Sequence, residues 1–194
     1  MASASETKRF FAGVEGNQGS DQPALLPTRE KDGAPKGNLW LLNLAEGEVK
    51  LEYTNGDGHP YIKYRADVIE PAEYEKRGVY GMFFFPRDIE GKEFESDREA
   101  EEAAERYESQ ASRIVGQIEA ILGPGTVSNL DVDNLEAGLE NLVSLLQDTA
   151  FVGKIGIERG KKKDPNDESK DAERYPDRNK ISFFYPADTW QGAG

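Results

Sequence analysis

The fold is decided by residues 50–68, which read KLEYTNGDGHPYIKYRADV. Apolar and polar residues alternate on both sides of the central TNGDG sequence, residues 54–58. Alternation with a period of two indicates a strand with one buried face. The Asn-Gly and Asp-Gly pairs tolerate the positive φ angles of tight turns. The stretch therefore predicts an antiparallel hairpin whose return strand is residues 61–69.

Outward from this hairpin, the sequence shows further strand patterns and two helical patterns. Strands are predicted at residues 38–44, 49–53, 61–69, 79–85, 151–158 and 180–185. Ser96 and Glu99 form a capping box that begins a helix, and the Gly-Pro-Gly sequence at residues 123–125 ends it. A second helix is predicted near residues 134–147.

This order of elements predicts a mainly β protein with inserted helices. We expect a five-stranded OB-like barrel whose helical segment, at about residues 96–147, lies between strands 3 and 4. Another small α+β sandwich is the alternative. The domain is expected to cover residues 37–190. Residues 1–36, rich in Gly, Ser, Asp and Pro, predict a poorly ordered N-terminal arm, and residues 191–194 form a short tail.

Composition excludes several kinds of site. The 194 residues contain no cysteine and one histidine, His59, which rules out disulfides, thiolate catalysis and clusters of cysteine or histidine around a metal. No serine lies in a nucleophile elbow, and no glycine run matches a phosphate-binding loop. We therefore expect a binding protein, not an enzyme, with no cofactor and no metal. Paired acids for a metal-dependent nuclease are the alternative that spacing leaves open.

The sequence also indicates where the protein works. No apolar run approaches the ~20 residues that a membrane-spanning helix needs. The first six residues, MASASE, lack the basic and apolar regions of a signal peptide. We expect a cytoplasmic protein that does not enter a membrane.

The negative charge is unevenly distributed. The net charge is −13, and residues 87–108 alone, with four basic and ten acidic residues, contribute −6 of it. An acidic protein as a whole repels nucleic acid, but segregation of the acids leaves room for a basic surface elsewhere. The same segment supports a different hypothesis, an acidic protein-interaction module or DNA mimic that inhibits a host protein.

The return strand carries the first candidate binding residues. Its even-numbered residues from 62 to 68 are apolar, whereas its other face carries Tyr61, Lys63 and Arg65. A ring beside two cations suits a single nucleic-acid strand, because the ring stacks on a base and the cations neutralise phosphates. An ordinary solvated strand face is the alternative.

Further candidates lie on the neighbouring strands and on the charged loop between the last two strands. On the strand at residues 79–85, Tyr80 and Phe84 share one face and Val79, Phe83 and Phe85 the other, and the sequence does not say which face is core. The other candidates for DNA binding are Lys154, Lys161, Lys162, Lys163, Arg174, Tyr175, Arg178 and Lys180. For the loop residues, a solvated loop is the alternative.

Two groups of segments resemble a known family. The first comprises residues 47–51, 61–68 and 78–80, and the second comprises residues 151–158, 175–181 and 184–186. Together they are similar to the opening and closing strands of small phage-encoded single-stranded-DNA-binding proteins, over about residues 45–187. The resemblance implies an OB fold and a role in phage DNA replication or recombination, in the cytoplasm of the host cell.

The functional hypothesis combines these observations. We expect a sequence-tolerant single-stranded-DNA-binding protein that needs no cofactor. A homo-oligomer is one of the assemblies that this hypothesis allows. Many single-strand binders recruit replication proteins through an acidic C-terminal tail, but residues 187–194 contain only one acid. The acidic helix is therefore the expected contact for replication or recombination proteins.

Overall fold

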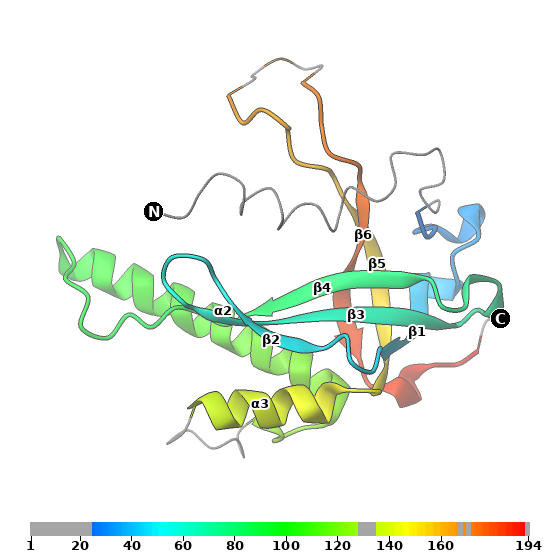
Figure 1. Cartoon of the computed structure of the whole chain (residues 1–194), viewed down its shortest axis with the longest axis horizontal. Coiled ribbons are helices and arrows are strands. Elements are labelled where there is room, and N and C mark those ends of the chain that lie inside the picture. The colour runs from blue at the N-terminus through cyan, green and yellow to red at the C-terminus, as the bar shows by residue number, and fades with distance from the viewer. Residues whose placement is uncertain (1–24, 128–134, 167–168, 170–171, 193–194) are drawn as a thin grey trace.

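The computed structural model describes residues 25–127, 135–166, 169 and 172–192. Six strands form one mainly antiparallel sheet, with two helices between the fourth and fifth strands (Figure 1). The strands are β1 (Leu39–Leu44), β2 (Lys50–Tyr53), β3 (Pro60–Glu70), β4 (Gly78–Phe84), β5 (Ala150–Glu158) and β6 (Arg178–Tyr185). The predicted strands and their order are thus confirmed, with ends that shift by one or two residues.

The long strand β3 organises one half of the sheet. Its first residues pair with β2 and its last residues pair with β1, while β4 pairs with residues 61–67 of β3. Strand β4 occupies one edge of β3 along both the stretch that pairs with β2 and the start of the stretch that pairs with β1. Strands β1 and β2 therefore lie one after the other along the second edge of β3. They are separated by a short turn in which the Glu48 amide donates to the Ala45 carbonyl at 3.1 Å and Gly47 adopts a φ of +76°.

The sheet differs from the five-stranded barrel that the sequence predicts. It has six strands because the turn at residues 45–49 divides the first long strand into β1 and β2. The hydrogen-bonded order is β2-β3-β1-β5-β6, with β4 on the other side of β3. Strands β4 and β6 lie in contact but form no ladder within the residues described here, so hydrogen bonding does not close the sheet into a barrel.

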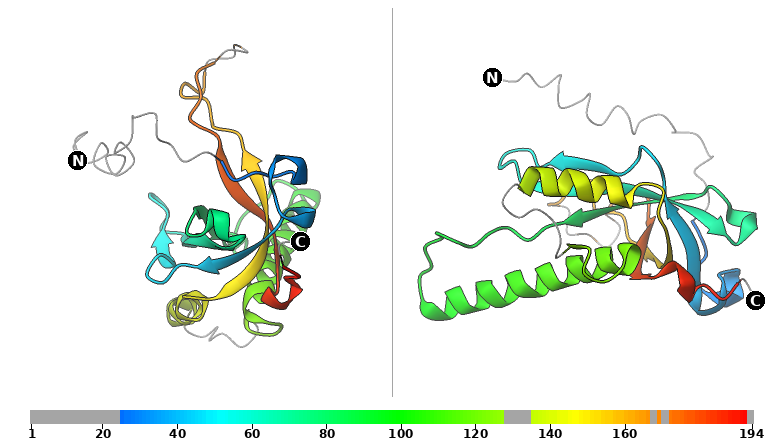
Figure 2. Two further views of the ribbon diagram at one scale, coloured as in Figure 1. Left: turned by 90° about the vertical axis from the view of Figure 1, so that its right-hand side faces the viewer. Right: turned by 90° about the horizontal axis from the view of Figure 1, so that it is seen from below.

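Two helices connect β4 to β5, as the sequence predicts. Helix α2 (Asp97–Leu122) begins where the Ser96 hydroxyl accepts the Glu99 amide at 3.3 Å, and α3 (Leu135–Leu146) is shorter. The buried residues of α2 all belong to its second half, which packs against β5 and β6. Its first half extends past the end of the sheet (Figures 1 and 2). None of the described helices is both long and apolar enough to span a lipid bilayer.

The core lies between the inner face of the sheet and these helices. Fully buried residues include Trp40 and Leu42 of β1, Phe151 of β5 and Ile118 of α2. Part of the segment expected to be a poorly ordered arm also packs here, because Leu26 is 2% exposed and exchanges hydrogen bonds of 2.7 and 3.2 Å with the Asn179 side chain. Residues 25–36 therefore belong to the packed domain, and the rest of the expected arm lies outside the described residues.

Candidate functional site

Strand β4 has apolar residues on both faces, and the structure decides which of them are core. Val79 and Phe83 are each 1% exposed and lie opposite Ala66 and Ile62 of β3 in the strand register. On the other face, Tyr80, Met82 and Phe84 are 56%, 43% and 47% exposed. The inner face of β4 thus completes the core, and its outer face leaves three large apolar side chains in solvent.

The outer residues of β3 and β4 form one continuous surface, which we call the outer ladder. Its members are Tyr61, Lys63 and Arg65 of β3 and Phe84, Met82 and Tyr80 of β4, which face each other in that order. The Tyr61 and Phe84 rings stack at a centroid distance of 4.9 Å and an interplanar angle of 21°. The Arg65 guanidinium lies 5.9 Å from the centre of the Tyr80 ring, which is within the range of cation–π attraction.

Two carboxylates moderate the charge of this surface. Glu52 of β2 accepts a hydrogen bond from the Tyr61 hydroxyl at 2.7 Å and lies 3.5 Å from the Lys63 ammonium. The hydrogen bond to Glu52 raises the pKa of the Tyr61 phenol, so this ring stays neutral. Partial burial opposes the charge of Arg65, but Asp67, at 2.7 Å, raises its pKa above the ordinary value. The outer ladder therefore presents aromatic rings beside cations.

The connection between β5 and β6 is more ordered at its base than a solvated loop. The Tyr175 amide donates to the Lys161 carbonyl at 2.9 Å, and the Lys163 amide donates to the Glu173 carbonyl at 2.8 Å. These bonds extend the two strands into a hairpin that projects from the sheet on the side opposite the helices (Figure 1). We call the described residues of this connection, 159–166, 169 and 172–177, the β5–β6 hairpin.

A groove joins this hairpin to the outer ladder. It has a volume of about 340 Å³, and Met82 lines it together with Lys161, Tyr175 and Arg178. Tyr175 is 58% exposed. The groove therefore brings three of the predicted DNA-binding residues beside the outer ladder, although β4 and the β5–β6 hairpin are about 80 residues apart in the sequence.

Other predicted residues have different surroundings. Arg174 donates to the Gly160 carbonyl at 3.0 Å, and Lys162 lies opposite Arg174 in an isolated bridge, so both support the hairpin itself. Lys154 is exposed on β5 opposite Phe183, and Lys180 lies opposite Gly156. Neither Lys154 nor Lys180 lines the groove.

Ion pairs reduce the net positive charge that the sequence suggests. Within the described part of the chain, ion pairs join Lys63 to Glu52, Arg65 to Asp67, Lys163 to Glu173 and Arg178 to Glu158. The Lys63 and Arg178 side chains are nevertheless 50% and 61% exposed. Exposed pairs of this kind are typically worth about 0–1 kcal/mol, so a phosphate can replace the carboxylate at small cost.

Sequence reasoning missed Met82 as a site residue. It lies between Tyr80 and Phe84 on the outer face and also lines the groove. The alternation that groups Tyr80 with Phe84 also includes Met82, so the signal was present in the sequence. A contiguous exposed apolar patch of this kind marks an interaction surface more often than scattered exposed residues do.

Comparisons with known proteins add no relative. No family model, curated protein or solved structure matches the chain. Among the residues that the structure describes, no three histidine or acidic side chains are grouped so that they could hold a metal ion.

Proposed function

We propose that this protein binds single-stranded DNA across the outer ladder and the groove beside it. The observation that carries the proposal is the continuity of rings and cations from the half-buried Tyr61 and the exposed Phe84 through Met82 to Tyr175 and Arg178. Single-strand binders combine such rings, which stack on bases, with a positive groove that follows the backbone. Because every base has a π face, the expected binding is tolerant of sequence.

The arrangement of strands supports an OB-type barrel as part of this proposal. An OB barrel has five strands, and β1 and β2 together correspond to one long strand divided by a turn. The helices lie between the strands that would be third and fourth, and contact between β4 and β6 brings the two ends of the sheet together. In such barrels the outer faces of the second and third strands, here β3 and β4, bind nucleic acid.

The energetic requirement for binding is modest. Base stacking contributes about 1–3 kcal/mol per base, and the outer ladder offers the Tyr80 ring and the Tyr61–Phe84 pair for it. Lys63, Arg65, Lys161 and Arg178 supply the charges for phosphates. We propose that this binding serves phage DNA replication or recombination, which is the role that the resemblance noted in the sequence implies.

Fluorescence anisotropy with a labelled oligo-dT strand tests the proposal. We expect the full chain to bind single-stranded DNA more tightly than a duplex of the same length, with an affinity that falls as salt rises, because bound phosphates release counterions. Equal or absent binding of both forms at low salt would refute the proposal.

Variants locate the site. Replacing Tyr80 and Phe84 by alanine removes two exposed rings, and we expect a loss of at least tenfold in affinity at constant salt. The matched control is Tyr53→Ala, because Tyr53 is 47% exposed on the opposite face of β2 and its hydroxyl donates to Glu136 at 3.2 Å. An equal loss of DNA affinity in Tyr53→Ala would show that the outer ladder is not the DNA-binding site.

The first half of α2 favours a second candidate function, which is binding of a protein partner. This half projects past the sheet (Figure 2). Its acids Asp97, Glu99, Glu101 and Glu105 are exposed, and Glu102 pairs with both Arg98 and Arg106. A basic surface of a replication or recombination protein would complement it. Salt-sensitive capture of such a protein, lost when Glu101 and Glu105 are replaced by glutamine, would support this role.

A further inference from the structure

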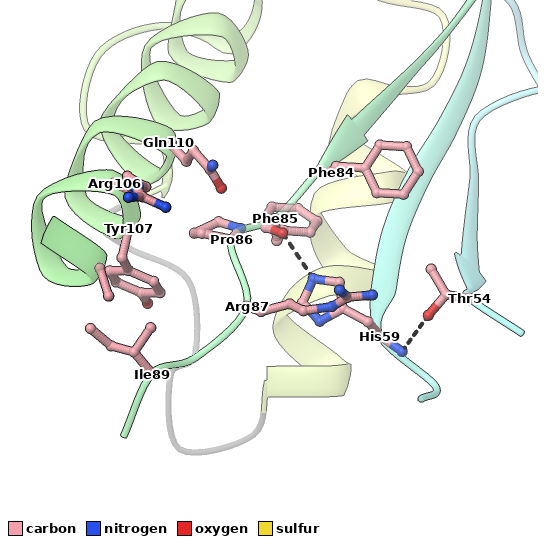
Figure 3. Close-up of a pocket in the computed structure, with 11 residues that line it drawn as sticks. Thr54, His59, Phe84, Phe85, Pro86, Arg87, Ile89, Arg106, Tyr107 and Gln110 are labelled. Atoms are coloured by element: carbon pink, nitrogen blue, oxygen red, sulfur yellow. Dashed lines mark hydrogen bonds between the residues drawn. The ribbon is translucent and has the colours of Figure 1, made fainter. Parts of the chain in front are cut away.

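A second hollow begins where the outer ladder ends. Phe84, the last residue of β4, belongs to the ladder and also lines this hollow. The other walls come from the turn between β2 and β3, from the chain after β4 and from the middle of α2 (Figure 3). We call it the end pocket. Its volume of about 420 Å³ lies within the range of small-ligand sites, ~300–1,000 Å³.

Two guanidinium groups line the end pocket. Arg87 pairs with Asp57 at 2.7 Å, and Arg106 pairs with Glu102 at 3.2 Å. Their side chains are 62% and 73% exposed, so solvent screens both pairs and an incoming anion can displace the carboxylates. A guanidinium prefers phosphate oxygens as partners, because its planar fork donates two parallel hydrogen bonds.

The remaining walls supply partners for a base. Tyr107 and Gln110 line the pocket from α2. The Phe84 ring faces the pocket from β4, across the Pro86 and Arg87 segment from these two side chains (Figure 3). The Gln110 amide offers a donor and an acceptor, which matches the edge of a nucleobase. The His59 ring is already engaged by the Phe85 carbonyl at 2.8 Å, which fixes this wall of the pocket.

We infer that the end pocket binds one nucleotide of a single strand that leaves the outer ladder at Phe84. Arg106 and Arg87 would hold the phosphate, and Tyr107 with Gln110 would contact the base. The inference rests on the proposed function and adds to it a defined end of the binding track, between α2 and the end of β4.

The test compares two arginines of α2 that share one carboxylate. Glu102 pairs with Arg106 and also with Arg98, at 3.0 Å, but only Arg106 lines the end pocket. In the full chain, we expect Arg106→Gln to weaken binding of an oligo-dT strand about tenfold at low salt. The slope of log affinity against log salt should also decrease by about 0.7, as for one lost phosphate contact. Arg98→Gln removes the same charge and should leave both quantities unchanged.

A second measurement locates the nucleotide. Oligo-dT strands carry one 4-thiothymidine at the 5′ end, at the centre or at the 3′ end, and are photo-crosslinked to the protein. We expect one end, and not the centre, to crosslink to the peptide that contains Tyr107 and Gln110. Circular dichroism of each variant confirms that it is folded.

The outcomes separate the inference from the proposed function. If the wild-type chain binds but Arg106→Gln behaves like Arg98→Gln and no crosslink reaches α2, the end pocket is refuted and the outer ladder stands. If the wild-type chain binds no single strand, both are refuted.

Discussion

The two faces of the β3–β4 ladder carry similar side chains in opposite surroundings. On the inner face, Tyr64 and Phe83 are 3% and 1% exposed, with ring centroids 4.7 Å apart. On the outer face, Tyr61 stacks on Phe84 at 4.9 Å, but Phe84 is 47% exposed. Burial of the inner rings stabilises the fold. The outer rings gain much less from folding, so their presence is better explained by a ligand that covers them.

The largest expected effect is the difference in stability between variants of the inner and the outer face. Phe83→Ala removes a buried ring and leaves a cavity, so we expect its free energy of unfolding to fall by about 3–5 kcal/mol. Phe84→Ala loses mainly the stack on Tyr61, so a cost of about 1 kcal/mol is expected. Urea denaturation of both variants measures the difference. Equal losses would mean that the outer ring is also structural.

Two glycines of β4 sharpen the same comparison. A Cβ at Gly81 would lie 2.3 Å from the Tyr64 ring, so Gly81→Ala overpacks the inner face and should cost about 1–3 kcal/mol. A Cβ at Gly78 would meet the Arg65 side chain at 2.5 Å, and this flexible side chain can move. We therefore expect Gly78→Ala to retain most of its stability while weakening DNA binding. Thermal unfolding and anisotropy of both variants check the pair, and the reverse pattern would contradict it.

The sequence predicts correctly which face of β3 is buried, but it does not decide which face of β4 is buried. The reason is physical. In β3, the even-numbered residues from 62 to 68 are apolar and the other face is polar, so the alternation alone identifies the buried side. In β4, residues 79–84 read VYGMFF, which is apolar on both faces. Only the register with β3, which places Phe83 opposite Ile62, selects the core.

The site could be predicted only in part. Local alternation brings Tyr61, Lys63 and Arg65 onto one face, and the structure places them there. The pairing of Lys63 with Glu52 and the approach of Tyr175 to Met82 join residues from separate elements. No local pattern specifies such contacts.

Electrostatics provides a smaller test of the outer face. We expect Lys63→Gln to reduce the salt dependence of DNA binding by about 0.7 in the log–log slope and to leave stability nearly unchanged, because its ion pair with Glu52 is exposed. Anisotropy at several salt concentrations measures the slope. An unchanged slope would show that Lys63 does not meet a phosphate.

The smallest expected effect concerns the turn that aligns β2 with β3. A hydrogen bond from the Thr54 hydroxyl, supported by the His59 amide and by Arg87, holds the pKa of Asp57 below its usual range. Since this pKa is lower in the folded state, Asp57 stabilises the fold above its unfolded pKa, and the contribution is lost as pH falls through the folded pKa. Thr54→Val should raise the Asp57 pKa, which carboxyl NMR titration measures. A pKa that stays low in this variant would contradict the assigned cause.

The central claim is that the outer face of β3 and β4 contacts single-stranded DNA. The most direct measurement is an NMR titration of the ¹⁵N-labelled full chain with an oligo-dT strand. We predict that the largest amide shifts fall on the outer ladder and the groove, around Tyr61, Tyr80, Met82 and Tyr175, while the start of α2, from Asp97 to Glu101, stays unchanged. Shifts confined to the start of α2, or no shifts at saturating DNA, would contradict the claim.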